Sequence, residues 1–196
     1  FPIEEVIDTF SKFGSKFIGH PNNKLPGIEM NSGSLGHGLP VCVGMALAGK
    51  MNHQNYRVYT VMGDGELAEG SVWEGAMSAA HYKLDNLCAV VDRNRLQISG
   101  NTEDVMHHDD LHERFRSFGW HVIDVKNGNS IEELDAAFEE AKTVKGKPTV
   151  LIANTVKGCG SSVMENKASW HHHVPGDEEY EQIMKDLEER KEAALK

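Results

Sequence analysis

Two polar residues follow two apolar runs of the chain, in positions where they could bind a metal ion and a phosphate. Asp64, with a glycine on each side, comes directly after the β-branched run at residues 59–62, and Asn94 follows a second apolar run at residues 87–91. A carboxylate and an amide oxygen suit Mg²⁺, which takes few protein ligands and completes its octahedron with phosphate oxygens and water. The flanking glycines let the backbone approach a phosphate closely. This pattern favours a Mg²⁺–diphosphate site over a simple strand-to-helix turn, which would use the same glycines.

The elements around these residues form a βαβ unit. Both apolar runs have the composition of buried parallel strands, and residues 66–82 between them have helical spacing. The apolar residues expected on one face of that helix are Leu67, Trp73, Met77 and Ala80. The carboxyl ends of parallel strands meet at one edge of a sheet, where a helix N-terminus also offers N–H groups to anions. We therefore expect Asp64 and Asn94 to lie close together.

The remaining pattern predicts a single α/β domain over residues 1–196, with a doubly wound, mostly parallel sheet and helices on both faces. A capping box at Ser130 and Glu133 marks the start of one amphipathic helix. An apolar stripe predicts another helix from Pro2 to Gly14. The strand before Asp64 is expected over residues 57–62, and further strands at residues 120–125 and 148–153. Further helices are expected at residues 41–51, near residue 111 and from residue 177 onward.

Two loops carry residues whose role the pattern leaves open. His20 lies in a loop rich in glycine and proline, where it is either an ordinary surface histidine or a functional one. Residues 31–38 form a glycine-rich loop that either cradles a phosphate through backbone N–H groups or only permits close helix packing.

Two groups of histidines have the composition of metal sites. Residues 107–112 combine three histidines with two aspartates, but they lead into a helix, which favours a solvated helix start. Residues 171–173 are three consecutive histidines, as in a purification tag or a nickel site. Their internal position, between Trp170 and Pro175, argues against both.

Composition excludes several classes of protein. The chain has 196 residues, 39% hydrophobic and 26% charged, enough for one domain with a sizeable core. Its formal charge of −10 and lack of a basic cluster argue against a nucleic-acid partner. Neither a signal peptide nor a membrane-spanning run is present. Cys42, Cys88 and Cys159 share no CxxC spacing, so free thiols in a reducing cytoplasm are expected.

Five motifs together resemble one known family. They are Gly19-His20-Pro21, Gly33-Ser34-Leu35-Gly36-His37-Gly38, Gly63-Asp64-Gly65-Glu66-Leu67-Ala68-Glu69-Gly70, Asp92-Arg93-Asn94, and Lys157-Gly158 through Trp170-His171. In this set the chain resembles the thiamine-diphosphate-binding (PP) domain of transketolase. It is similar in particular to the N-terminal subunit of split, two-chain transketolases, and the resemblance covers nearly the whole chain.

The resemblance implies a role for each matching residue. It implies thiamine diphosphate and Mg²⁺ as cofactors, with Ca²⁺ or Mn²⁺ as substitutes for the metal. The metal ligands would be Asp64, Asn94 and the carbonyl of Leu96. The residues at the cofactor would be Gly33, Ser34, Leu35, Gly65, Glu66, Asn94 and His171. His20 at the hydroxyl end of the sugar and His171 at the diphosphate and the substrate would be the catalytic residues, and Glu69 would lie at a subunit contact.

The implied activity is transfer of a two-carbon ketol unit from a ketose phosphate to an aldose phosphate, as in the pentose phosphate pathway. The cofactor supplies the carbanion chemistry and the protein orients it. Relative to the family, the sequence lacks an N-terminal segment and the pyrimidine-binding domain. We therefore expect no activity from the chain alone. A C-terminal transketolase subunit would supply the pyrimidine-binding domain, and a homodimer of this chain would lie within a cytoplasmic heterotetramer.

The sequence departs from the family pattern in two places. Ser34 and His37 stand where many members have proline and glutamine, and the register of the histidines at 171–173 is open by one or two positions. Alternative functions are a deoxyxylulose-phosphate synthase-like enzyme, a transketolase for a branched or sulfonated sugar, and a non-catalytic subunit that binds the cofactor. We exclude a nucleotide-binding domain because no Gly-x-Gly-x-x-Gly follows a strand and no Lys-Ser/Thr ends a P-loop.

Overall fold

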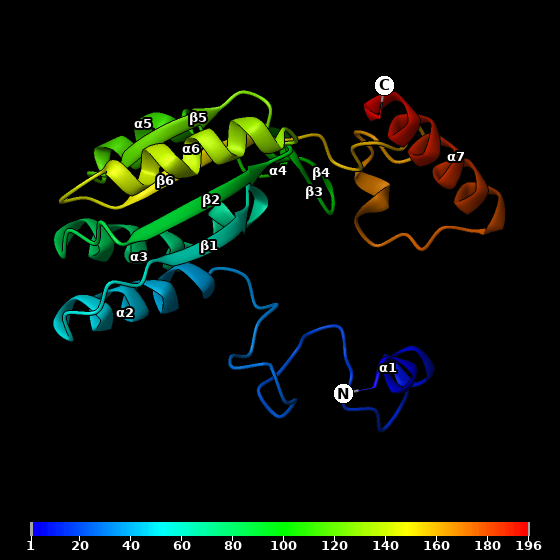
Figure 1. The fold of residues 1–196 in the computed structure, drawn as a ribbon, viewed down its shortest axis with the longest axis horizontal. Helices are drawn as coiled ribbons and strands as arrows, with labels where there is room; N and C mark the ends of the chain where they lie inside the picture. Colours follow the sequence, from blue (N-terminus) through cyan, green and yellow to red (C-terminus); the bar gives the residue numbers. More distant parts are fainter. Residues whose placement is uncertain (1, 196) are drawn as a thin grey trace.

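A four-stranded parallel sheet forms the centre of the protein. The structure is a computed structural model that describes residues 2–195, so both end residues of the predicted domain, 1 and 196, lie outside the described residues. The strand order is β1-β2-β6-β5 (Figure 1). The strands are β1 (Val58–Gly63), β2 (Leu87–Arg93), β6 (Thr149–Asn154) and β5 (His121–Val125). All pairs are parallel, as predicted from the apolar runs.

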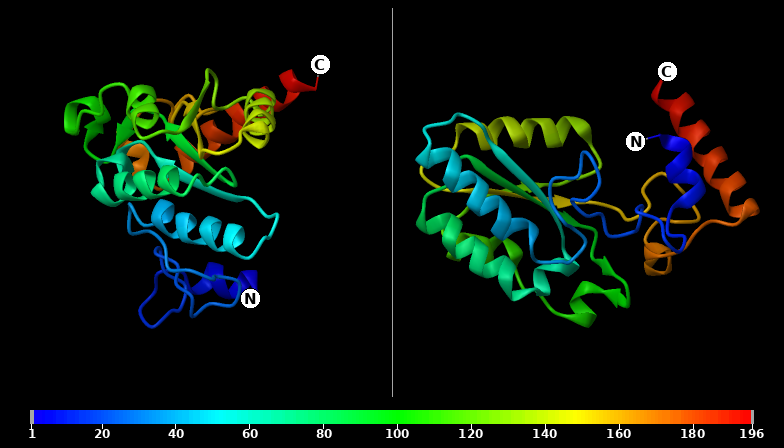
Figure 2. Two further views of the ribbon diagram at one scale, coloured as in Figure 1. Left: turned by 90° about the vertical axis from the view of Figure 1, so that its left-hand side faces the viewer. Right: turned by 90° about the horizontal axis from the view of Figure 1, so that it is seen from below.

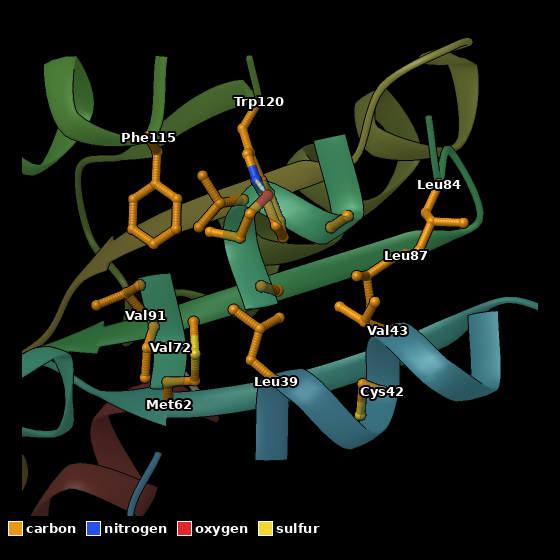
Figure 3. Close-up of a cluster of buried hydrophobic side chains, with 14 of the residues drawn as sticks. Leu39, Cys42, Val43, Met62, Val72, Leu84, Leu87, Val91, Phe115 and Trp120 are labelled. Carbon is orange, nitrogen blue, oxygen red and sulfur yellow. Dashed lines mark hydrogen bonds between the residues drawn. The ribbon is translucent and has the colours of Figure 1, made fainter. Parts of the chain in front are cut away.

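Helices cover both faces of this sheet, which confirms the doubly wound prediction. The helices α2 (Gly38–Met51), α3 (Gly70–His81) and α5 (Leu111–Ser117) share one buried cluster with the central strands. Figure 3 shows this cluster, in which Leu39, Met62 and Phe115 are fully buried. Each such side chain contributes roughly 1.5–3 kcal/mol by leaving water. On the opposite face, α6 (Ile131–Thr143) packs over β2, β5 and β6.

The remaining elements lie near the carboxyl edge of the sheet or beyond it. They are α1 (Ile3–Thr9), the 3₁₀ helix η1 (Gly65–Ala68), the antiparallel pair β3 (Leu96–Gln97) and β4 (Gly100–Asn101), α4 (Thr102–Val105), η2 (Ala168–His171) and α7 (Asp177–Ala194). Both terminal helices stand away from the sheet (Figures 1 and 2). The apolar stripes of both helices are exposed. They are Ile3, Ile7 and Phe10 at α1, and Tyr180, Met184 and Leu187 in α7. No helix within residues 2–195 is long and apolar enough to span a bilayer.

The helix predicted over residues 66–82 is interrupted. Residues Gly65–Ala68 form a 3₁₀ turn that the Asp64 side chain caps, and Glu69 is extended at φ −76° and ψ 126°. The α-helix therefore begins only at Gly70. The break separates the turn that forms the pocket wall from the helix that packs on the sheet.

The predicted apolar face of this helix is confirmed for Leu67, Trp73 and Ala80, which lie in the core cluster or pack against it, and was wrong for Met77. Met77 is 53% exposed, while Val72, Ala76 and Ala79 are buried. The reason is close packing of α2 on α3, since a Cβ at Gly75 would lie 3.3 Å from the Pro40 ring. Two helices can pack this closely only where small residues line the contact. The larger Met77 therefore lies outside the contact, in solvent.

Other element boundaries differ by a few residues from those predicted. α2 begins at Gly38 rather than at residue 41, because Pro40 is accommodated in a first helical turn. α1 ends at Thr9, well short of Gly14. At α6 the N-cap is confirmed, as the Glu133 N–H donates to Ser130 Oγ at 3.2 Å.

Candidate functional site

A pocket of about 560 Å³ opens at the carboxyl edge of the sheet. Gly63 pairs with Asp92 in the β1–β2 register, so the residues that follow each strand emerge side by side. The sequence-predicted site residues that line the pocket are Leu35, Asp64, Gly65, Glu66, Asn94, Leu96 and His171. Of the described residues, His20, Gly33 and Ser34 belong to the predicted site but not to this pocket lining.

Asp64 is held in the pocket wall by backbone groups. Its side chain is almost fully buried, at 2% exposure. One carboxylate oxygen accepts a hydrogen bond from the Gly65 N–H at 2.9 Å and the other from the Arg95 N–H at 2.5 Å. Burial raises the pKa of Asp64, while these two hydrogen bonds act in the opposite direction. A cation in the pocket would offset the cost of burying this charge.

The segment after β2 forms the other wall. The Asn94 side-chain oxygen accepts a hydrogen bond from the Leu96 N–H at 2.9 Å. Leu96 then pairs with Asn101 in the β3–β4 hairpin, which fixes this segment across the pocket. Gln97, a residue of the wall that sequence reasoning missed, has a buried Oε1 with no hydrogen-bond partner among the described residues.

These residues fit thiamine diphosphate with Mg²⁺. One buried carboxylate, one amide oxygen and one backbone carbonyl are the kind of set that Mg²⁺ uses together with phosphates. A Cβ at Gly65 would lie 3.0 Å from Gln97 Cβ, so a larger residue would crowd the pocket wall. Lys157, which belongs to the fifth sequence motif and lies on the loop after β6, adds a cation to the lining.

Glu66 ties the glycine-rich loop to the end of β1. Its two carboxylate oxygens accept hydrogen bonds from the Gly36 N–H at 2.8 Å and the Gly63 N–H at 3.2 Å. The Ser71 hydroxyl donates to the Gly36 carbonyl at 2.8 Å, so α3 also holds this loop. Gly33 and Ser34 line a smaller neighbouring cavity of about 170 Å³, which shares Leu35 and Glu66 with the main pocket.

The structure separates the candidate histidines. His20 is exposed, and its ring packs on Gly33, where a Cβ would lie only 2.2 Å from the ring. His171 lines the main pocket, and partial burial, Lys157 and His172 lower its pKa. The described lining contains neither His172 nor His173, and the latter pairs with Glu179 at 2.8 Å. Of the three consecutive histidines, His171 therefore faces the pocket.

The prediction of a solvated helix start at residues 107–112 is confirmed in part and wrong for one residue. Asp110 caps α5, and the described residues contain no group of three metal ligands. His107 is exposed and pairs with Asp109 at 2.8 Å. His108, however, is buried at 2% exposure, and Asp64, which follows β1, is among the charged groups near it. Asp64 comes from a distant part of the chain, which local sequence does not reveal.

Comparison with known proteins identifies the family. The model of the "Transketolase, thiamine diphosphate binding domain" family matches residues 1–193. The chain belongs to the transketolase family. It is 50% identical over 190 residues to an apulose-4-phosphate transketolase subunit of Phocaeicola vulgatus, a match that covers 97% of this chain and 67% of the relative. It is 40% identical over 189 residues to a 6-deoxy-6-sulfo-D-fructose transketolase subunit of Clostridium sp., over 96% of this chain and 68% of that protein.

Solved transketolases share the fold. The Campylobacter jejuni transketolase superposes with a TM-score of 0.86 at 30% identity, over 94% of this chain and 30% of that one. The Leishmania mexicana transketolase superposes with a TM-score of 0.75 at 29% identity, over 97% and 34%. The chain thus spans about two thirds of the subunit relatives and about a third of these longer transketolases. It is a transketolase thiamine-diphosphate-binding domain in sequence and in fold.

Proposed function

We propose that this chain binds thiamine diphosphate through Mg²⁺ in the main pocket, as one component of a split transketolase. The complete enzyme transfers a two-carbon ketol unit from a ketose phosphate to an aldose phosphate. The observation that carries this proposal is the convergence of Asp64, Asn94 and Leu96 in one pocket beside the turn at Gly65. When bound, the cofactor supplies the carbanion chemistry.

The residues of this chain orient the cofactor and handle charge. Asp64 is the anionic ligand of Mg²⁺, and Asn94 and the Leu96 carbonyl are neutral ligands, a set that also accepts Ca²⁺ or Mn²⁺. Lys157 neutralises phosphate oxygens. His171, whose lowered pKa keeps its ring neutral near pH 7, accepts or donates a proton at the substrate end. His20 acts with it from the loop beside Gly33.

The active enzyme includes a second kind of subunit. The relatives in Phocaeicola vulgatus and Actinobacillus succinogenes support this arrangement, since each is named as one subunit of a transketolase, which implies at least one other. The partner carries the pyrimidine-binding domain, and a homodimer of this chain lies within a cytoplasmic heterotetramer. The exposed apolar stripes of α1 and α7 support association, because large apolar side chains gathered on a surface favour burial against a partner.

A second candidate function differs in its substrate. Two relatives are named for apulose-4-phosphate and one for 6-deoxy-6-sulfo-D-fructose. These names favour a transketolase for an unusual ketose over one confined to the pentose phosphate pathway. The chemistry at the cofactor is the same for both classes of substrate. Substrate specificity therefore depends on residues outside the main pocket.

Reconstitution tests the proposed function. The chain is assayed alone, and then mixed with the pyrimidine-domain protein encoded beside it, with thiamine diphosphate, Mg²⁺ and a panel of ketose phosphates and sulfonated ketoses. We expect two-carbon transfer only in the mixture, and only with both cofactors. Cofactor binding without transfer from any ketose would indicate a non-catalytic role. Absence of cofactor binding in the mixture would overturn the proposal.

A further inference from the structure

A further pocket, of about 530 Å³, opens at the carboxyl edge of the sheet, where β2, β5 and β6 end. Its described lining shares no residue with that of the main pocket. Arg93 and Arg95 line the further pocket, whereas Asn94 and Leu96 line the main one. The end of β2 therefore separates two pockets, and we call the further one the arginine pocket.

Arg93 brings a positive charge without a partner to this pocket. It is the last residue of β2 and pairs with Asn154 of β6 in the strand register. Arg93 is half-buried, yet its guanidinium forms no hydrogen bond or ion pair with any described residue. Charges that proteins withdraw from water are normally paired, because an unpaired one costs free energy. The Arg93 fork of N–H donors is therefore available to an anion in the pocket.

Hydrogen bonds between β5 and β6 orient the second guanidinium. The Asn154 amide nitrogen donates to Asp124 and to the Val125 carbonyl, each at 2.9 Å. The Asn154 oxygen accepts a hydrogen bond from the Arg95 guanidinium at 3.1 Å. Because this acceptor is neutral, it holds the Arg95 side chain in place and leaves its charge uncompensated.

The lining has an excess of positive charge. Asp124 is the single carboxylate in its described part, and it is already engaged. One oxygen of Asp124 accepts hydrogen bonds from Asn154 and His112, and the other accepts from Lys126. Three cations, Lys126 and the two arginines, therefore face one anion, which leaves an excess of two positive charges when His112 is neutral. The chain as a whole has the opposite sign, with a formal charge of −10.

We propose that the arginine pocket binds a phosphate group, either free or carried by a small metabolite. A phosphate group has a charge close to −2 near neutral pH, which matches the excess in the lining. Its oxygens also accept the paired N–H bonds that a guanidinium fork donates. The volume of the pocket is in the range that holds a small organic ligand. The site needs neither the metal nor thiamine diphosphate, so it stands independently of the proposed function.

Titration of the isotope-labelled chain with inorganic phosphate, followed by nuclear magnetic resonance without thiamine diphosphate or metal, tests the site. We expect the amide signals of residues 93–95, 124–126 and 154–156 to shift together and to saturate. Arg93→Gln should weaken phosphate binding by about tenfold or more, the effect of losing charge-assisted hydrogen bonds. Arg93→Lys keeps the charge without the fork and should weaken binding less.

Two control variants separate this site from other cations. Arg116→Gln removes an arginine that pairs with Glu113 and lies outside the described lining, so phosphate affinity should not change. Lys157→Gln alters the main pocket and should leave the affinity measured at residues 124–126 unchanged. A parallel titration with a ketose phosphate identifies the source of the group. Tighter binding than inorganic phosphate assigns the site to a sugar phosphate, and equal affinity assigns it to the free anion.

Absence of shifts in the three segments would overturn the proposal. Equal weakening in Arg93→Gln and Arg116→Gln would also overturn it, because it indicates a general effect of charge. Acetate that binds as tightly as phosphate would contradict a site matched to a doubly charged group. No phosphate binding, combined with weaker assembly of Arg93→Gln with the partner subunit, would assign the pocket to an acidic side chain of that partner instead.

Discussion

Asp64 combines two properties that conflict in most proteins, a full negative charge and almost complete burial. Only backbone N–H groups neutralise its oxygens, and burial raises its pKa. A buried carboxylate is well suited to bind a metal ion, because the cation compensates for the water molecules that the carboxylate loses on burial. In the proposed site, a bound cation would compensate the charge of this carboxylate.

Asp64→Ala should abolish metal-dependent cofactor binding and leave the fold intact. The substitution removes the only full negative charge among the proposed Mg²⁺ ligands, while most of the core lies elsewhere. Calorimetry with thiamine diphosphate and Mg²⁺ on the assembled enzyme measures the loss. Asn94→Ala should weaken binding less in the same assay, because water can replace a neutral ligand. Unchanged affinity in Asp64→Ala would remove this residue from the site.

His171→Ala should lower turnover of the reconstituted enzyme by about ten- to ten-thousand-fold, the range for losing a positioned proton-transfer group. The melting temperature should stay nearly constant, because the ring is exposed and little buried surface is lost. His20→Ala should behave in the same way. Steady-state kinetics and thermal unfolding of each variant provide the test.

His107→Ala is the control for this series and should change neither property. His172→Ala should also retain turnover, since the described pocket lining includes His171 and not its neighbour. Loss of turnover in His172→Ala, with turnover retained in His171→Ala, would assign the catalytic role to His172 instead of His171. A His20→Ala variant that melts early but turns over normally would make His20 structural.

At the scale of secondary-structure elements, Asp124 connects β5, β6 and α5 through hydrogen bonds. It lies in β5 and accepts hydrogen bonds from Asn154 of β6 at 2.9 Å and from His112 of α5 at 3.0 Å. Lys126 donates to its second oxygen. Burial alone would raise the pKa of Asp124, but these hydrogen bonds outweigh burial and hold the pKa at about 2, below the ordinary 3.8.

Asp124→Asn should destabilise the protein near neutral pH and change its acid unfolding. A carboxyl whose pKa is lowered on folding contributes stability above its unfolded pKa and loses it as pH falls through the folded value, here between about 4 and 2. Allowing for solvent screening of a side chain that is one quarter exposed, the contribution is about 1–2 kcal/mol.

Urea unfolding of parent and variant at pH 6 and at pH 2.5 measures this contribution. The difference in free energy of unfolding should be present at pH 6 and much smaller at pH 2.5. Asp8→Asn, at an exposed position in α1, is the control and should change neither value. A difference that persists at pH 2.5 would assign the effect to shape rather than charge.

At the scale of the whole molecule, α2 and α3 form a layer whose outer side is apolar. Met45 and Met77 are each about half exposed. Trp73, which the helix pattern grouped with Met77, instead packs inside the molecule, stacked on Phe118 with its indole N–H donating to the Leu67 carbonyl at 2.9 Å. The outer residues of this layer are therefore the ones available to a second copy of the chain.

Met77→Glu should weaken self-association of the chain by about tenfold or more, the effect of losing one apolar interface contact. Its melting temperature should stay near that of the parent. Trp73→Ala should do the reverse, with a loss of about 3 kcal/mol in stability from the cavity it leaves. Sedimentation equilibrium and thermal unfolding provide the two readouts. A parent chain that stays strictly monomeric at high concentration, with the partner present, would contradict the proposed homodimer.

The sequence by itself determined the sheet and the edge at which the site lies. Apolar runs such as residues 87–91 are typical of buried parallel strands, and the carboxyl ends of parallel strands lie at the same edge of a sheet. The meeting of Asp64 with Asn94 follows from that rule. The N-cap at Ser130 was equally predictable. Serine is a favoured N-cap residue, because its hydroxyl oxygen accepts a hydrogen bond from a backbone N–H in the first turn, here that of Glu133.

Tertiary structure alone decided which residues the fold buries and which it exposes. His108 has a polar, charged local sequence, yet it is buried, and Asp64, which follows β1, is near it. Met77 is exposed because α2 approaches α3 through Gly75. His171 lines the pocket and His173 does not, because α7 holds the latter through Glu179. For His108 and Met77 the neighbour named comes from a distant segment, and for His173 it lies six residues further along the chain. Local periodicity carries no information about any of these contacts.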